Sequence, residues 1–161
     1  NWVGAFEADS TAFMRTERYQ VIVCAVSTLF MLPDQDAQLR CLGCARDHLR
    51  PGGIVVVEAF VPDSARFDHN ERTEVRRLDD NGAHVLVSRH EPSLQRIHNE
   101  HVLIDRSGVH RHAVTLRYSS PAELDLMAHL AGLTLERRFG GWKNEPYDDT
   151  TTDPVSCDRP P

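Results

Sequence analysis

The sequence predicts an α/β fold in which a doubly wound, mostly parallel sheet carries an antiparallel β insertion. Two observations support this fold class. An unbroken apolar run, YQVIVCAV, is typical of a strand buried on both faces of a parallel sheet, and a similar run, IVVVEAF, follows after a helical segment. The stretch between residues 70 and 119 instead alternates polar and apolar positions, which is typical of antiparallel strands with one solvated face.

The segment between the two apolar runs is predicted to be an amphipathic helix that covers the sheet. Asp34 is placed to cap its first turn. Its apolar residues recur at helical spacing: Leu39, Leu42, Ala45 and Leu49. We expect the stretch Pro51-Gly52-Gly53 to end the helix, because proline cannot continue it and glycine adopts tight turns. Strand, helix and strand then form a right-handed βαβ unit.

Turn signals divide the alternating stretch into antiparallel strands. Asn81-Gly82 and Ser107-Gly108 are typical of hairpin turns. After them, Ser120 and Glu123 have the spacing of a helix capping box, and we expect that helix to end at Gly132. Residues 133–139 and, more weakly, 154–157 are predicted to add strands to the first sheet.

Composition and charge limit the classes of function. With 161 residues, 40% of them hydrophobic and 26% charged, the chain fits one globular domain. The net charge of −6 and the scattered basic residues argue against a nucleic-acid partner. No apolar run approaches the ~18 residues of a membrane span, and the N-terminus has no signal-peptide pattern, so we expect a cytoplasmic protein without a membrane partner.

The four cysteines give no complete metal site. Cys41 and Cys44 form a C-x-x-C pair, whereas Cys24 and Cys157 stand alone. A structural zinc site needs four ligands, and no second pair completes the set. We therefore expect reduced thiols and no metal.

Two segments resemble a known family. Residues 19–63, YQVIVCAVSTLFMLPDQDAQLRCLGCARDHLRPGGIVVVEAFVPD, and more loosely residues 117–142, RYSSPAELDLMAHLAGLTLERRFGGW, are similar to the C-terminal two-thirds of class I S-adenosylmethionine-dependent methyltransferases. The resemblance is to the small-molecule type, which includes N-methyltransferases of amino sugars. It implies a Rossmann-like sheet, S-adenosylmethionine as cofactor, and methyl transfer to N or O of a small-molecule acceptor by in-line displacement.

The resemblance also implies which part of the fold each segment of the chain forms. Residues 1–60 would be part of the Rossmann-like cofactor half, residues 61–119 an antiparallel lid, and residues 120–161 the closing helix and strands. The cofactor cleft would lie at the carboxyl end of the first predicted strand. Its residues would be Cys24, Ala25 and Val26 beside the methionine part of the cofactor, with Ser27 and Leu29 at the pocket edge.

The N-terminal end departs from the family pattern. Gly4-Ala5-Phe6 stands where the family often has a Gly-Asp pair that recognises adenine, so backbone groups and Phe6 would make that contact. The glycine-rich loop of the family should precede the segment, yet 18 residues lie before Tyr19 and the chain begins with Asn1. We therefore expect an N-terminally truncated sequence, or alternatively a catalytically incompetent remnant or interaction module. An unpaired sheet edge would then favour homo-oligomers or self-association.

Catalytic and acceptor residues are less defined. A general base is needed only if the acceptor loses a proton, and His101 and His112 of the insertion are the candidates, with solvated strand surface as the alternative. A metal shared with His98 and His110 is disfavoured, because H-x-x-H on a strand points to opposite faces. Four candidate acceptor contacts, each with a structural alternative, are Phe30, Arg117, Tyr118 and Trp142.

Overall fold

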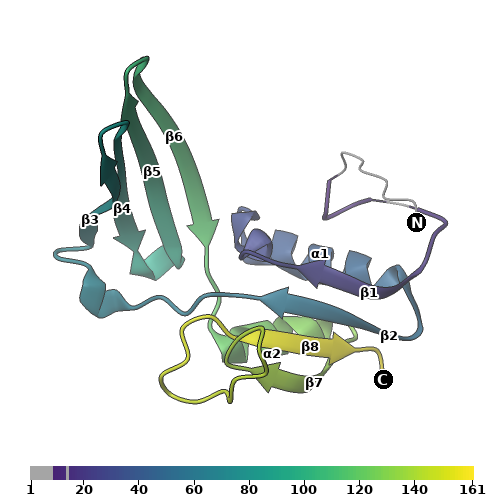
Figure 1. The fold of residues 1–161 in the computed structure, drawn as a ribbon. Coiled ribbons are helices and arrows are strands. Elements are labelled where there is room, and N and C mark those ends of the chain that lie inside the picture. Colours follow the sequence, from purple (N-terminus) through teal and green to yellow (C-terminus); the bar gives the residue numbers. More distant parts are fainter. Residues whose placement is uncertain (1–8, 14) are drawn as a thin grey trace.

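Two four-stranded sheets organise the computed structural model, which describes residues 9–13 and 15–161 (Figure 1). The helical elements are η1 (Thr28–Met31), α1 (Gln35–Asp47), η2 (Ser64–Arg66), η3 (Pro92–Leu94) and α2 (Pro121–Leu130). The strands are β1 (Tyr19–Cys24), β2 (Leu49–Glu58), β3 (Glu71–Asp79), β4 (Gly82–Glu91), β5 (Arg96–Asp105), β6 (Gly108–Arg117), β7 (Thr134–Phe139) and β8 (Val155–Arg159). Within the described residues, no helix is long and apolar enough to cross a membrane.

The first sheet has the strand order β1-β2-β8-β7. β1 and β2 are parallel, and β8 runs antiparallel to both of its neighbours. The predicted last, weak strand is therefore an internal strand of the sheet, and Val155, Ser156 and Asp158 are buried there. Within the described residues, β1 forms one edge of this sheet, and its outer side is unpaired, as expected from the sequence.

Both long helices pack against one face of the first sheet. The core between them contains Leu42, Val55, Val57, Met127 and Leu133. On the other face of β1, Val21 and Val23 are 48% and 51% exposed. The expectation that this strand is buried on both faces is therefore wrong for the part of the chain that the structure describes.

The turn between α1 and β2 differs in detail from the prediction. α1 begins at its predicted cap, since Asp34 accepts a hydrogen bond from the Ala37 N–H (2.8 Å). It ends at Asp47, and β2 already begins at Leu49, so Pro51-Gly52-Gly53 lies inside the strand at a shift of register with β1. A side chain at Gly53 would meet the carbonyl oxygens of Arg50 and Tyr19 at 3.0 Å, which explains the glycine.

The second sheet is an antiparallel meander of order β3-β4-β5-β6, as the alternating pattern predicts. Gly82 (φ 138°) closes the first hairpin, and a side chain there would collide with the Ile104 carbonyl oxygen. Figure 1 shows the meander beyond the end of the first sheet toward which β1 and β2 point. This placement matters for function, because ligands of open α/β sheets bind at the carboxyl ends of the strands.

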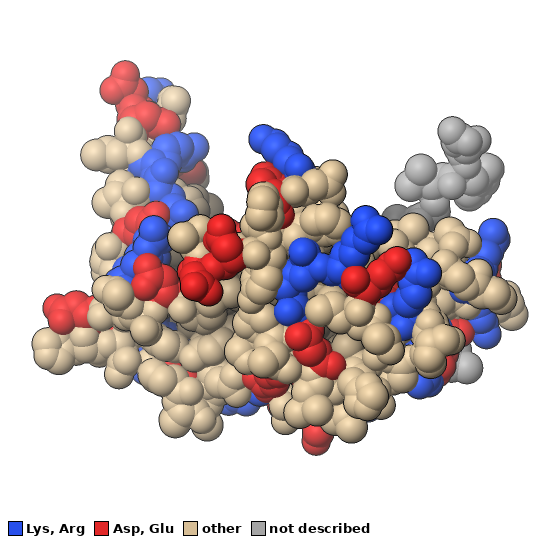
Figure 2. All heavy atoms as spheres, turned by 90° about the horizontal axis from the view of Figure 1, so that it is seen from below, with Lys and Arg blue, Asp and Glu red and all other residues tan. Residues whose placement is uncertain are grey.

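The molecular surface carries both signs of charge. Figure 2 shows Lys and Arg side chains intermingled with Asp and Glu side chains on the face seen from below. Elsewhere in the described residues, charged side chains form ion pairs at the surface, such as Arg66 with Asp63 and Arg159 with Glu136. The face in Figure 2 therefore presents no stripe of a single sign.

Candidate active site

The chain leaves β1 through a turn with an uncommon backbone conformation. Val26 and Ser27 both have a φ of 53°, in the left-handed region that a β-branched residue rarely adopts. The Val26 side chain is 78% exposed, and its N–H donates to the carboxylate of Glu58 at the end of β2 (2.6 Å). The next residues are buried in η1, with Leu29 2% and Phe30 0% exposed. A strained, exposed turn thus lies beside the carboxyl ends of two parallel strands.

The expected cofactor residues fall into three groups. Cys24, Ala25, Val26 and Ser27 form the end of β1 and this turn, so they lie together where the cleft was expected. Leu29 lies in the core rather than at an open edge. Gly4, Ala5 and Phe6 lie outside the described residues.

No two of the four cysteines are joined by a disulfide. All four are free thiols, and the described residues contain no group of His, Cys, Asp and Glu side chains that could hold a metal ion. A hydrogen bond with the Cys41 thiol and burial both raise the pKa of Cys24, so its thiol stays protonated. Cys24 therefore acts as a small apolar side chain under the turn.

An open pocket of about 500 Å³ lies between the end of β2 and the meander. The segment after β2 contributes Phe60 and Asp63, and the loop before β8 contributes Asp153. β4 and β5 contribute Ser88 and Asn99, whose side chains are joined by a hydrogen bond of 2.6 Å. The pocket therefore combines an aromatic wall with hydrogen-bonding groups, as small-molecule sites do.

The charges around this pocket are largely paired. Glu74 pairs with both Arg72 and Arg76, and its distance to Arg76 is 3.2 Å. Arg66 pairs with Asp63 at 3.3 Å. The basic side chains are thus compensated by neighbouring carboxylates. Such a lining suits a polar ligand held by hydrogen bonds rather than by one strong charge.

The two candidate base residues lie farther along the meander. His101 and His112 are direct partners in β5 and β6, and His84 Nε2 lies 3.0 Å from His101 Nδ1. Burial, and then the charges of His84, His112 and Arg76, lower the pKa of His101, which favours the neutral imidazole that a base requires. Neither His101 nor His112 lines the pocket, so their role as base stays a prediction.

His98 and His101 lie on opposite faces of the meander. It contacts Glu91 at 3.0 Å and Thr115 at 2.9 Å. His101 instead contacts His84, on the opposite face of β5. The H-x-x-H pair is therefore divided between the two faces of the sheet.

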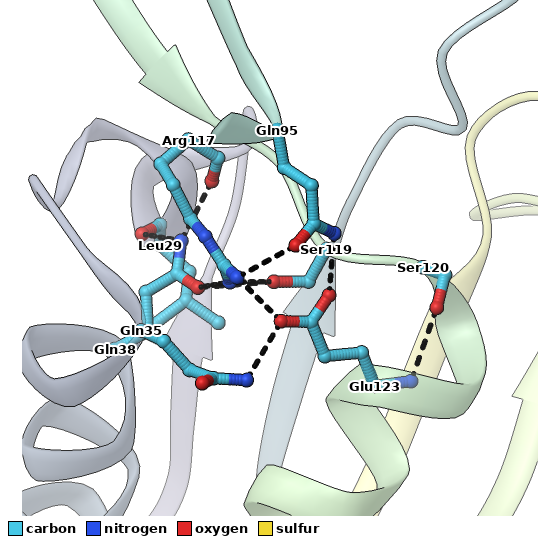
Figure 3. A network of polar contacts seen from close by, with 8 residues as sticks. All are labelled: Leu29, Gln35, Gln38, Gln95, Arg117, Ser119, Ser120 and Glu123. Atoms are coloured by element: carbon cyan, nitrogen blue, oxygen red, sulfur yellow. Dashed lines mark hydrogen bonds and ion pairs between the residues drawn. The ribbon is translucent and has the colours of Figure 1, made fainter. Parts of the chain in front are cut away.

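Arg117 occupies a buried polar network instead of an open site (Figure 3). Its guanidinium donates to Gln38 (2.8 Å), Ser119 (2.6 Å), Gln95 (3.0 Å) and Glu123 (2.5 Å). These partners occupy the guanidinium, so the structure gives Arg117 a structural role that joins the meander to α1 and α2. No pattern in the sequence indicates that Gln38 and Gln95 belong to this network.

Glu123 shows why the predicted capping box forms only in part. The Ser120 hydroxyl accepts the Glu123 N–H at 3.2 Å, as predicted. The Glu123 carboxylate turns away from the cap and accepts from Arg117, Gln35 and Gln95. The side chain therefore joins the buried network.

The other expected acceptor contacts lie in different surroundings. Phe30 is fully buried and packs edge-on against Phe60 at 5.2 Å, so its ring supports a pocket wall from behind. The Tyr118 hydroxyl lies 2.8 Å from His90 Nε2, and burial raises the pKa of Tyr118. Trp142 is 56% exposed. The structure does not bring these three side chains together with Arg117 around one cavity.

No family model and no curated protein matches the chain. Among solved structures, the chain is 33% identical to the CcbJ methyltransferase from Streptomyces caelestis, with a TM-score of 0.88 over 96% of this chain and 62% of that one.

Two more distant structures share the fold. An S-adenosylmethionine-dependent methyltransferase from Clostridium acetobutylicum ATCC 824 is 11% identical, with a TM-score of 0.84 over 95% of this chain and 63% of that one. CalS10 from Micromonospora echinaspora, an amino pentose methyltransferase involved in calicheamicin biosynthesis, is 20% identical, with a TM-score of 0.66 over 94% of this chain and 63% of that one. The chain therefore spans somewhat under two-thirds of the length of the structures it matches.

Proposed function

This chain has the Rossmann-like fold of S-adenosylmethionine-dependent methyltransferases, and on that premise we propose that it transfers a methyl group from S-adenosylmethionine to N or O of a small-molecule acceptor. The observation that carries the proposal is the likeness to CcbJ over 96% of the chain. The position of the pocket beyond the carboxyl end of β2 supports it.

The proposed cofactor site is the end of β1. Ala25 has a small side chain next to the left-handed turn, so a ligand can approach the backbone there. When bound, S-adenosylmethionine supplies an electrophilic methyl group. The task of the chain is then to hold donor and acceptor in line, which is the main source of rate in such a transfer.

The proposed acceptor site is the pocket under the meander. Phe60 and Leu116 give it apolar walls, and Ser88 and Asn99 provide hydrogen-bonding groups. An acceptor that binds as an ammonium ion must lose a proton before its nitrogen can attack the methyl carbon. Asp63 and Asp153 are the carboxylates that line the pocket, whereas His101 and His112 would reach it only through a further movement or an extended acceptor.

The direct test is transfer of a labelled methyl group from S-adenosylmethionine to a panel of amino sugars, simple amines and alcohols. We expect labelled product with at least one acceptor class and none with Ala25→Trp, because the large side chain would fill the cofactor side of the cleft. Labelled product that is equal in wild type and Ala25→Trp would contradict the proposed site.

A second candidate function is an interaction module that keeps the fold without the activity. It is favoured by the outer edge of β1, which no strand of the described residues pairs. Self-association through this edge belongs to the same proposal. Size-exclusion chromatography showing a stable monomer would argue against self-association, and saturable cofactor binding would argue against loss of function.

A further inference from the structure

The turn after β1 keeps a disfavoured backbone conformation through one hydrogen bond of its own and one external constraint. For a residue with a Cβ, the left-handed region is disfavoured, most of all when the side chain is β-branched. Val26 and Ser27 both adopt it in succession. The burial of Leu29 and Phe30 fixes the chain after the turn, and the Phe30 N–H donates to the Ser27 carbonyl oxygen at 2.9 Å. The Thr28 N–H donates to the Ala25 carbonyl oxygen at 3.1 Å and closes the turn, but none of these contacts engages the Val26 N–H.

Glu58 provides the constraint at Val26. Its carboxylate accepts the Val26 N–H at 2.6 Å, across 32 positions of sequence. Glu58 is the last residue of β2, and Val57 pairs with Cys24 in the parallel register, so the two strands bring Glu58 level with the turn. Hydrogen bonds from a backbone N–H to an ionised carboxylate are among the stronger ones. The Ser27 side chain makes no capping bond that would replace it.

We propose that Glu58 is a positioning residue for the cofactor. By holding the Val26 N–H, it keeps the turn in the left-handed conformation and so presents Ala25 and the exposed Val26 to the cleft. The inference rests on the proposed function. Glu58 acts through the turn and needs no contact with the cofactor, which distinguishes it from a binding residue.

The first arm of the test measures the turn without any ligand. We compare amide hydrogen exchange of the 161-residue chain in wild type, Glu58→Ala and the control Glu136→Ala. Glu136 is a partly exposed carboxylate on β7 that pairs with Arg159, distant from the turn in sequence and fold. We expect exchange in residues 25–28 to rise at least about tenfold in Glu58→Ala, the size expected for the loss of one hydrogen bond to a charged group, and to stay unchanged in the control. Unchanged exchange in Glu58→Ala would overturn the proposal.

The second arm measures the consequence for the cofactor by calorimetric titration with S-adenosylhomocysteine. We expect Glu58→Ala to weaken binding about tenfold, and Glu58→Gln, which keeps an acceptor oxygen, to weaken it by only about threefold. Adding Val26→Gly to Glu58→Ala should restore most of the loss, because glycine adopts the left-handed region without a steric penalty.

The outcomes separate this inference from the proposed function. If Glu58→Ala weakens binding and Val26→Gly does not restore it, Glu58 contacts the ligand directly and the positioning role is wrong. Loosening of the turn with unchanged affinity would also overturn it. Absence of binding by wild type would count against the proposed function and against any role of Glu58 toward the cofactor, whereas the exchange arm would still report whether Glu58 holds the turn.

Discussion

The guanidinium of Arg117 and the carboxylate of Glu123 lie 2.5 Å apart, with side chains only 9% and 16% exposed. Arg117 ends the last strand of the meander, and Glu123 lies in the first turn of α2. Gln38 of α1 closes the network by donating to the Arg117 carbonyl oxygen at 2.7 Å. The position of the meander over the proposed acceptor pocket therefore depends on a buried polar junction.

Replacement of Arg117 should destabilise the protein strongly. Arg117→Ala leaves the buried carboxylate of Glu123 without its charged partner, and we expect a loss of about 3 kcal/mol in the free energy of unfolding. Denaturant titration of wild type and variant measures it. The control is Arg111→Ala, whose side chain is 70% exposed beside Glu100 and which should change stability by less than about 1 kcal/mol. Equal effects of the two substitutions would contradict the structural role of Arg117.

Asp158 should make stability depend on pH between about 4 and 6. Burial, and then the charge of Asp125, raise the pKa of Asp158 to about 6, while Arg138 opposes the shift. Among the described residues, its buried Oδ1 has no hydrogen-bond partner. The folded state thus holds the proton more tightly than the unfolded state, where the pKa is about 3.9, so stability is highest below that value and is lost as pH rises through about 6.

The raised pKa of Asp158 also sets the size of the pH-dependent change in the free energy of unfolding. About two pKa units correspond to about 3 kcal/mol at most between the two pH limits. Asp158→Asn removes the titrating group, so its free energy of unfolding should exceed that of wild type increasingly as pH rises from 4 to 7. Parallel pH profiles for the two proteins would show that Asp158 carries no such penalty.

His101 should titrate below the ordinary histidine pKa of about 6.5. Burial and the neighbouring His84, His112 and Arg76 disfavour its charged form. Since the folded state resists protonation, the meander should lose stability as pH falls from 6.5 through the pKa of the folded protein. An NMR titration of the imidazole resonances measures this pKa directly, with His101→Asn to assign the signal. A value at or above 6.5 would remove the argument that His101 is kept neutral.

The acceptor pocket can be tested with two adjacent residues of β5. Asn99 lines the pocket between the meander and the first sheet, whereas the next residue, Glu100, projects from the other face. Asn99→Trp should reduce methyl transfer at least about tenfold and leave binding of S-adenosylhomocysteine within about twofold, because it fills only the acceptor side. Glu100→Trp is the matched control and should retain activity. If both variants lose transfer equally, the pocket is not the acceptor site.

The sequence predicted much of the fold, because hydrophobic patterning and turn residues act locally. The βαβ order, the meander with its Gly82 and Gly108 turns, and the caps at Asp34 and Ser120 follow from patterns that span a few residues. The exposure of Val21 and Val23 could not be predicted in this way, because it depends on whether another element covers that face of the sheet. The internal place of β8 likewise depends on pairing with β2, almost 100 residues earlier.

The candidate site was less predictable, because side chains from distant segments build it. The sequence predicted a strand that includes Ala25 and Val26, whereas β1 ends at Cys24 and both residues lie after it. The resemblance indicated neither the left-handed turn nor the hydrogen bond from the Val26 N–H to Glu58. An arginine at this position can either bind an acceptor or pair with a buried carboxylate. The sequence therefore did not reveal the network of Arg117 with Gln38.

Calorimetric titration of the chain with S-adenosylhomocysteine tests the central claim most directly. We expect saturable binding with one site per chain, and loss of that binding in Ala25→Trp, since the proposed cleft lies at the end of β1. Heat that does not saturate, or binding that Ala25→Trp leaves unchanged, would contradict the account.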